Sequence, residues 1–121
     1  MENPTDRLIA LSQIDPQGFN VLTHGDCWTN NIMFQHDDQG NVTKTYFVDY
    51  QLSKYGSPCE DLNYFLFSST ENGLIAQDYD YLIRFYYDNL VEHLEILKYE
   101  GRKPSLRELH ETMLKTGNKG L

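Results

Sequence analysis

Two β-rich arms on either side of a turn-forming cluster constrain the fold more than any other feature of the sequence. Residues 31–34 read as a strand, residues 37–41 as a polar turn and residues 43–49 as a second strand, which together predict a β-hairpin. Asn31 and Asp49 each lie nine residues from the glycine in that turn. Antiparallel arms of equal length would therefore bring Asn31 and Asp49 together at the open end of the hairpin.

A polar loop at residues 24–30 precedes the hairpin and contains His24 and Asp26. The preceding residues 19–23 are β-rich, so we predict that a short strand leads into the loop. The folded hairpin would then place Asp49 beside a loop that carries a second carboxylate and ends at an amide. The sequence predicts a site assembled from separate segments.

Phosphoryl transfer needs this kind of arrangement of oxygen ligands. A magnesium ion that bridges phosphate oxygens is held by hard oxygen donors, while a further carboxylate orients the attacking hydroxyl. We predict that Asn31 and Asp49 hold Mg²⁺ and that Asp26 accepts a hydrogen bond from the substrate hydroxyl and later its proton. His24 lies further back along the loop, and we predict that it braces the loop through hydrogen bonds.

Other interpretations of the same residues remain open at this point. Gly, Asp and Asn are common in surface turns, so the loop alone fits a polar turn, and an Asp at the end of a strand often caps a turn. A metal-dependent hydrolase that uses the same carboxylates with water is less favoured, because no third carboxylate or histidine is placed beside them.

Helices are expected in the remainder of the chain. Apolar residues at three- and four-residue steps predict a long helix over residues 75–99, and shorter helices are predicted over residues 3–12, 61–68 and 105–115. We expect Gly101 to stop the long helix, Ser105 and Glu108 to form a capping box for the last helix, and residues 116–121 to form an unstructured tail.

Composition narrows the classes of partner. A formal net charge of -8 disfavours nucleic acid and anionic membrane surfaces as partners. The two cysteines form no disulfide framework and no metal-binding pattern, and residues 1–13 lack the apolar segment of a signal peptide. No segment has the roughly 18 apolar residues of a membrane span. We therefore expect a cytoplasmic protein with no membrane or nucleic-acid partner.

The motifs also resemble a known group of enzymes. The residues from His24 to Asn31, followed by Val48-Asp49-Tyr50-Gln51, resemble the signature shared by aminoglycoside phosphotransferases, choline kinases and protein kinases. The longer strings at residues 24–34 and 48–58 are similar to the ecdysteroid kinase-like family, also called the CHK kinase-like family. Cys27 and Tyr50 depart from the residues expected there, at positions that pack and do not react.

The resemblance implies a role for each matching residue. Asp26 matches the catalytic Asp, Asn31 the metal ligand of the catalytic loop, and Asp49 the Asp that binds Mg²⁺ at the phosphates of ATP. His24 matches the histidine that braces the loop, and Asp61 an acidic position that supports the loop without touching substrate. ATP and Mg²⁺ are thus the implied cofactors, and a small-molecule alcohol is the implied substrate.

The resemblance covers residues 19–115, and only 23 residues precede His24. No glycine-rich phosphate loop or strand lysine is found there, so we expect residues 1–121 to form part of a protein-kinase-like C-terminal lobe without its N-terminal lobe. The expected fold class is α+β, with the catalytic loop and the hairpin packed on helices. The alternative is a catalytically inactive pseudokinase or interaction module. The sequence identifies neither the acceptor nor the oligomeric state.

Overall fold

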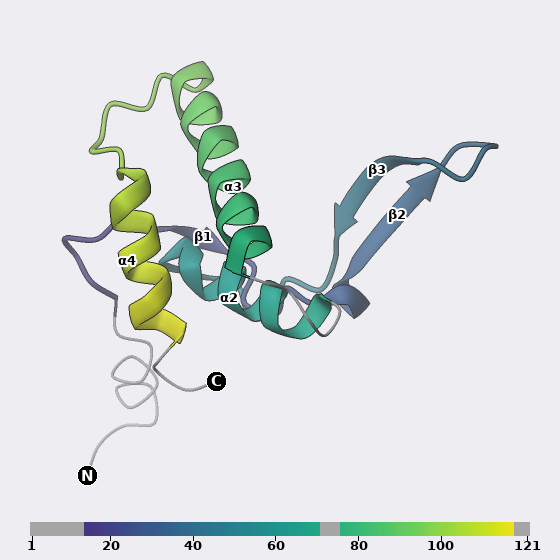
Figure 1. Ribbon diagram of the computed structural model, residues 1–121, viewed down its shortest axis with the longest axis horizontal. Coiled ribbons are helices and arrows are strands. Elements are labelled where there is room, and N and C mark those ends of the chain that lie inside the picture. The colour runs from purple at the N-terminus through teal and green to yellow at the C-terminus, as the bar shows by residue number, and fades with distance from the viewer. Residues whose placement is uncertain (1–13, 71–75, 118–121) are drawn as a thin grey trace, which may run out of the picture.

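The protein combines helices with two small antiparallel sheets, which confirms the predicted mixed α+β class (Figure 1). The structure is a computed structural model that describes residues 14–70 and 76–117. The elements, in chain order, are β1 (Val21–Thr23), the short 3-10 helix η1 (Thr29–Asn31), β2 (Ile32–His36), β3 (Val42–Phe47), β4 (Lys54–Gly56), α2 (Pro58–Ser69), α3 (Ala76–Ile96) and α4 (Leu106–Gly117).

The predicted hairpin is present as β2 and β3, and a second strand pair lies at the base of the loop. In the hairpin, Ile32 pairs with Phe47. In the second pair, β1 runs antiparallel to β4, with Val21 opposite Gly56. The sequence analysis missed β4, since a strand of three residues is too short to show an alternating pattern. The β1–β4 pair fixes the start of the loop next to the segment that leads into α2.

The hydrophobic core lies among the three helices. It consists of Cys59 and Leu66 from α2, Ile83 from α3, and Leu109 and Met113 from α4. Several residues of the apolar stripe predicted for α3 pack against this core, namely Tyr79, Leu82 and Tyr86. In residues 14–70 and 76–117, no helix combines the length and the low polarity that are needed to cross a membrane.

Helix α2 begins earlier than predicted. Ser57 is its N-cap, and the Ser57 hydroxyl accepts a hydrogen bond from the amide of Cys59 at 3.2 Å. Pro58 occupies the first helical position, where a missing N–H costs nothing. Glu60 and Asp61 lie in the first turn, where their negative charges interact favourably with the helix dipole. These features place Asp61 close to the N-terminal end of α2.

The ends of α3 and α4 also differ from prediction. Helix α3 ends at Ile96, and Lys98 has a φ of 56°, so Lys98 takes the left-handed position that we had expected of Gly101. The amide of Glu108 donates to the Ser105 hydroxyl as predicted, at 3.1 Å. The Glu108 carboxylate does not complete the capping box; it pairs with Arg102.

Helix α4 continues through Gly117, so residues 116–117 are helical although they were predicted to belong to an unstructured tail. The rest of that predicted tail and the predicted helix over residues 3–12 lie outside the described residues.

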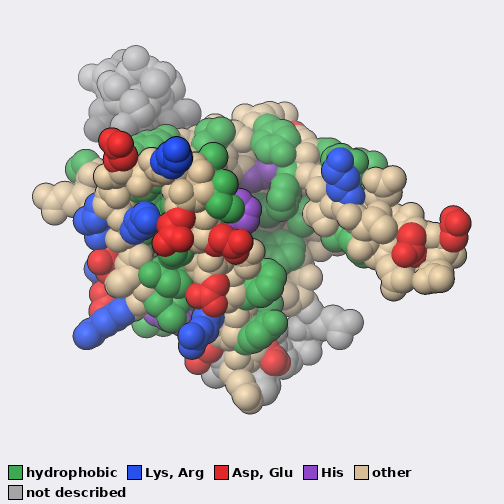
Figure 2. All heavy atoms as spheres, turned by 90° about the horizontal axis from the view of Figure 1, so that it is seen from above, with side chains coloured by type: hydrophobic (Ala, Val, Ile, Leu, Met, Phe, Trp, Pro, Cys, Tyr) green, Lys and Arg blue, Asp and Glu red, His purple; other side chains and the backbone are tan. Residues whose placement is uncertain are grey.

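The hairpin projects from the helical body, which differs from the predicted packing on helices (Figure 1). Its strands are exposed along nearly their whole length. The register explains this difference, because apolar residues occur on both faces: Ile32 and Phe47 share one face, and Met33 and Tyr46 share the other. Hydrophobic side chains are accordingly visible along the hairpin surface (Figure 2). A helix packed on one side could cover only half of them.

The loop after β1 passes very close to the turn before β4. Gly25 has a φ of 89°, and a Cβ atom at this position would lie 2.1 Å from the carbonyl oxygen of Leu52. Only glycine allows both this backbone conformation and this approach. Gly40, in the hairpin turn, has a similar φ of 87° but has open space where its Cβ would be.

The role of the helical core can be tested by truncating Ile83, which is fully buried. We expect Ile83→Ala to lower the free energy of unfolding by about 2–5 kcal/mol, because it removes buried methyl groups and leaves a cavity. Ile96→Ala, at a position that is 66% exposed on the same helix, should cost less than about 0.5 kcal/mol. Chemical denaturation measures both, and equal losses would contradict this assignment of the core.

The close approach at Gly25 predicts a difference between two glycine substitutions. Gly40→Ala should cost about 1–2 kcal/mol, the cost of a left-handed backbone for a residue with a Cβ. Gly25→Ala should cost roughly 1–3 kcal/mol more, because its Cβ also overlaps the Leu52 carbonyl. Unfolding curves of the two variants that coincide would show that the loop is not held against Leu52.

Candidate active site

The loop between β1 and η1 is anchored to α2 by one carboxylate. Asp61 accepts hydrogen bonds from two consecutive backbone amides, that of His24 at 2.7 Å and that of Gly25 at 3.0 Å. Each amide binds a different carboxylate oxygen. Hydrogen bonds to an ionised acceptor are stronger than those between neutral groups, so Asp61 holds the start of the loop firmly.

The His24 imidazole connects the loop to the hairpin. Its Nε2 lies 2.7 Å from the carbonyl oxygen of Val48, and its Nδ1 accepts a hydrogen bond from the amide of Asp26 at 3.1 Å. Because Nδ1 accepts, the proton of the neutral ring is on Nε2, which donates to Val48. The ring is buried, and it lies against Tyr50 with a centroid separation of 4.8 Å.

Both carboxylate oxygens of Asp26 receive a hydrogen bond. Oδ2 accepts from the side-chain amide of Asn31 at 3.0 Å, and Oδ1 accepts from the hydroxyl of Tyr64 at 3.3 Å. The same Asn31 nitrogen also donates to the backbone carbonyl of Asp26, at 3.0 Å. The Asp26 side chain is half-buried and is held by donors from η1 and α2.

These contacts decide how the Asn31 amide is used. Because both of its partners on Asp26 are oxygens, the group facing them is the NH₂, and Oδ1 is the atom left to bind a ligand. The backbone of Asn31 is held by two hydrogen bonds as well. Its N–H donates to the carbonyl of Trp28 at 2.9 Å, and its carbonyl accepts from the N–H of Val48 at 3.0 Å. The structure thus brings Asp26 and Asn31 together.

Asp49 lies just outside the hairpin ladder. Its side chain is exposed, and its φ of 64° is in the left-handed region, which residues other than glycine enter at a cost of about 1–2 kcal/mol. The backbone bond between Val48 and Asn31 shows that Asn31 lies opposite Val48, so Asp49 is one residue further on. The predicted equal-arm register was wrong by one residue. The pair nearest the turn, His36 and Val42, is centred on Gln39 and not on Gly40, and the register shift between Gln35 and His36 reduces the resulting two-residue difference to one.

The donors at this end of the hairpin fit a magnesium ion. Mg²⁺ is usually bound through one or two carboxylates together with substrate phosphates and water. Within the described residues, Asn31 Oδ1 and the Asp49 carboxylate have no hydrogen-bonding partner, and both are hard oxygen donors. No group of three or more His, Cys, Asp or Glu residues that could hold a metal occurs in this part of the chain. A metal here would be held by Asn31 Oδ1 and the Asp49 carboxylate, with nucleotide phosphates and water as further ligands.

The cysteines are not activated. Partial burial, followed by the negative charges of Asp61 and Asp26, raises the pKa of the Cys27 thiol. Burial raises the pKa of Cys59 to about 11. Both thiols are therefore protonated at neutral pH, which disfavours nucleophilic catalysis by cysteine at this site.

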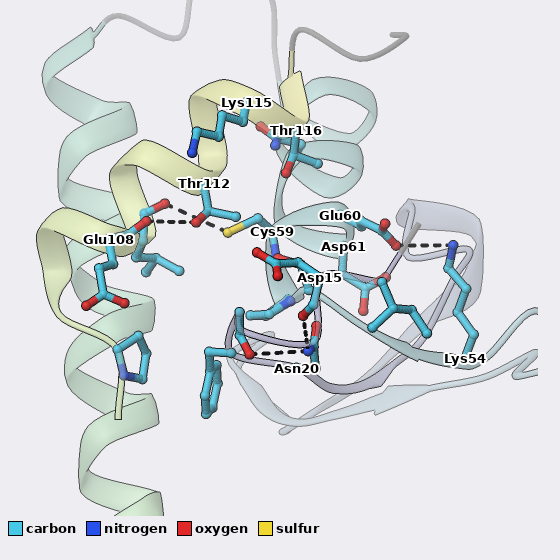
Figure 3. A pocket seen from close by; sticks show the side chains of 18 of the residues that line it. Asp15, Asn20, Lys54, Cys59, Glu60, Asp61, Glu108, Thr112, Lys115 and Thr116 are labelled. Atoms are coloured by element: carbon cyan, nitrogen blue, oxygen red, sulfur yellow. Dashed lines mark hydrogen bonds and ion pairs between the residues drawn. The ribbon is translucent and has the colours of Figure 1, made fainter. Parts of the chain in front are cut away.

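A cavity of about 610 Å³ lies between α2, α4 and residues 14–20 (Figure 3). Its walls include charged residues of both signs, and Lys54 and Glu60 pair across its edge at 3.3 Å. Gly25, Asp61 and Tyr64 reach its lining, whereas Asp26, Asn31 and Asp49 do not. The cavity thus adjoins residues that hold the loop but does not include the predicted catalytic and metal-binding side chains.

Sequence analysis missed three side chains that hold the loop. These are Tyr64, which donates to Asp26; Ser53, whose hydroxyl donates to the His24 carbonyl at 3.2 Å; and Ser69, whose hydroxyl accepts from the amide of Thr29 at 2.9 Å. A signal existed for Tyr64, because it lies three residues after Asp61 on one helix and so shares its face. Nothing comparable marks Ser53 and Ser69.

Comparison with known proteins gives one related kinase. The chain is 41% identical over 47 residues to a 4-hydroxytryptamine kinase of Psilocybe cyanescens. The match covers 38% of this chain and 13% of that relative's length. No solved structure matches the chain.

A family comparison covers far more of the sequence than this relative does. Residues 1–99 match the ecdysteroid kinase-like family, a stretch that includes β1, the loop, the hairpin, α2 and α3. It contains every residue that we placed at the candidate site. The chain therefore belongs to the ecdysteroid kinase-like family.

Proposed function

We propose that the protein is an ATP-dependent phosphotransferase that phosphorylates a hydroxyl group of a small molecule. The observation that carries this proposal is the arrangement of Asp26, whose carboxylate is held on both oxygens next to the Asn31 amide. Family membership supports a kinase-like function in general. The acceptor hydroxyl and the use of ATP are our inference.

In the proposed reaction, the hydroxyl oxygen of the acceptor forms a bond to the γ-phosphorus of ATP. The bond from that phosphorus to the oxygen bridging the β- and γ-phosphates breaks, and its electron pair leaves with ADP. Asp26 accepts a hydrogen bond from the hydroxyl, which aligns the attacking lone pair, and takes the proton as the new bond forms. Asp26 therefore acts mainly through its position.

We assign Asn31 and Asp49 to the magnesium ion that accompanies ATP. A bound Mg²⁺ would neutralise the charge that develops on the phosphate oxygens. Asn31 would contribute its Oδ1, because its nitrogen already binds Asp26. The left-handed backbone at Asp49 is consistent with this role, since strained residues cluster at functional sites. His24 and Asp61 would hold the loop without touching substrate.

We further propose that residues 1–121 form part of a kinase C-terminal lobe and that turnover belongs to the full-length protein. The match spans 13% of the related kinase's length. In the full-length protein, this chain would supply the loop and the hairpin of the active site. The compound in the name of that relative, 4-hydroxytryptamine, is a suitable first acceptor to test. We place the protein in the cytoplasm, in keeping with its two unpaired cysteines.

The catalytic role of Asp26 predicts a loss of turnover. In the full-length protein with Mg²⁺, ATP and hydroxyl acceptors that include 4-hydroxytryptamine, we expect Asp26→Ala to lower kcat by about 10²–10⁴-fold, with little change in the KM for ATP. ADP release measures both constants. Asp80→Ala, at an exposed position on α3, is the control and should retain full activity.

Turnover that survives Asp26→Ala would contradict the role given to Asp26. A full-length protein that binds ATP but turns over no acceptor would instead favour the inactive pseudokinase or interaction module.

The metal assignment can be tested on the chain itself by NMR. Mn²⁺ replaces Mg²⁺ at oxygen sites and broadens nearby amide signals, so low concentrations should broaden the signals of Asn31 and Asp49 first. Because Asp49→Asn removes a charged ligand, about 10-fold or more Mn²⁺ should be required to produce the same broadening. Asp38→Asn, in the exposed hairpin turn, is the matched control. Broadening centred on that turn would refute the assignment.

A further inference from the structure

We propose that Tyr64 is a positioning residue whose hydroxyl fixes the orientation of the Asp26 carboxylate for phosphoryl transfer. This inference rests on the proposed function, and it adds a residue of α2 to the machinery that acts on the acceptor hydroxyl. The observation that carries it is the hydrogen bond from the Tyr64 hydroxyl to Asp26 Oδ1, at 3.3 Å.

Helix α2 presents two side chains to the loop from one face. Asp61 and Tyr64 are three residues apart, so they lie on neighbouring turns of the same side of the helix. Asp61 binds the backbone amides at the start of the loop, and Tyr64 reaches the carboxylate two residues further on. Because α2 is part of the helical core through Cys59 and Leu66, both contacts are made from a rigid element.

The two donors on Asp26 act on opposite oxygens. Asn31 donates to Oδ2 and Tyr64 donates to Oδ1, so rotation of the carboxylate about its own axis would stretch both bonds. Each carboxylate oxygen can accept a second hydrogen bond, which leaves capacity for the acceptor hydroxyl. With both donors in place, that hydroxyl meets the carboxylate in one orientation. Small displacements of reacting groups reduce rates strongly, so this restriction matters for turnover.

The Tyr64 hydroxyl remains a donor under physiological conditions. Partial desolvation, the negative charge of Asp26 and the hydrogen bond to Asp26 all raise the pKa of the Tyr64 phenol above its usual value near 10. The phenol is therefore neutral at pH 7 and carries the proton that the contact requires.

The test compares two tyrosines that each donate one hydrogen bond. Tyr64→Phe removes the donor to Asp26, whereas Tyr87→Phe removes a donor to the Pro104 carbonyl, which lies 3.1 Å from its hydroxyl and is not part of the site. In the full-length protein, we expect Tyr64→Phe to lower kcat by roughly 10-fold or more with an unchanged KM for ATP. Tyr87→Phe should leave kcat unchanged.

A double-mutant cycle separates positioning from a purely structural role. In a protein that already carries Asp26→Ala, Tyr64→Phe should cause no further loss of kcat, because no carboxylate is left to orient. Tyr64→Phe should also shift the midpoint of chemical denaturation less in that background than in the wild type. The denaturation cycle does not depend on activity, so it tests the contact even if phosphoryl transfer is not observed.

Three results would overturn the proposal. Equal losses of kcat in both backgrounds would assign Tyr64 a structural role, and turnover that depends on Asp26 but not on Tyr64 would leave the proposed function intact without it. A full-length protein with no turnover at all, but with coupled denaturation midpoints, would reject the proposed function and leave Tyr64 as a structural partner of Asp26 only.

Discussion

The hydrogen bonds of the His24 imidazole set the geometry on which the whole candidate site depends. One ring nitrogen accepts from the Asp26 amide and the other donates to the Val48 carbonyl, so a single neutral side chain joins the loop to the end of the hairpin. Asp26 makes one of these bonds through its own amide, and Asp49 directly follows Val48, which accepts the other. Because the ring is buried, losing either partner would leave a polar group without a hydrogen bond, at a cost of about 1–3 kcal/mol.

Helix α2 supplies the second half of this framework. Its first turn places Asp61 against the amides of His24 and Gly25, and its next turn places Tyr64 against Asp26. The helix is fixed in turn by the core that it shares with α3 and α4. The site thus combines a rigid side, formed by α2 and the loop, with an exposed hairpin that ends at Asp49.

Local patterns in the sequence predicted much of this structure, but they did not predict the contacts between segments that are far apart in the sequence. The hairpin and the helices follow from turn residues and apolar periodicity, which are properties of neighbouring residues. The short strand β4 was missed because it is defined by its pairing with β1, whose partners are distant in the sequence: Val21 and Gly56 are 35 residues apart, and Thr23 and Lys54 are 31 apart. The one-residue error in the hairpin register arose because the turn is centred on Gln39 and not on Gly40, and the register shift between Gln35 and His36 compensates for only part of this difference.

The site shows the same division. Asp26 and Asn31 were predicted to belong to one site with Asp49, and the structure brings Asp26 and Asn31 to hydrogen-bonding distance. Tyr64 lies 38 residues from Asp26, so only the position of α2 reveals its contact. The role of Asp61 came from family resemblance, and the structure supplies a physical basis for it in the two backbone amides that it binds.

The proposed reaction requires that Asn31 and Asp49 hold the metal at the phosphates while Asp26 faces the acceptor. A crystal structure of the full-length protein with Mg²⁺ and a non-hydrolysable ATP analogue tests it most directly. We expect Asn31 Oδ1 and the Asp49 carboxylate to coordinate the ion at about 2.0–2.1 Å, with Asp26 turned toward the γ-phosphate. An ion coordinated by other side chains, or an Asp26 carboxylate directed away from the nucleotide, would contradict it.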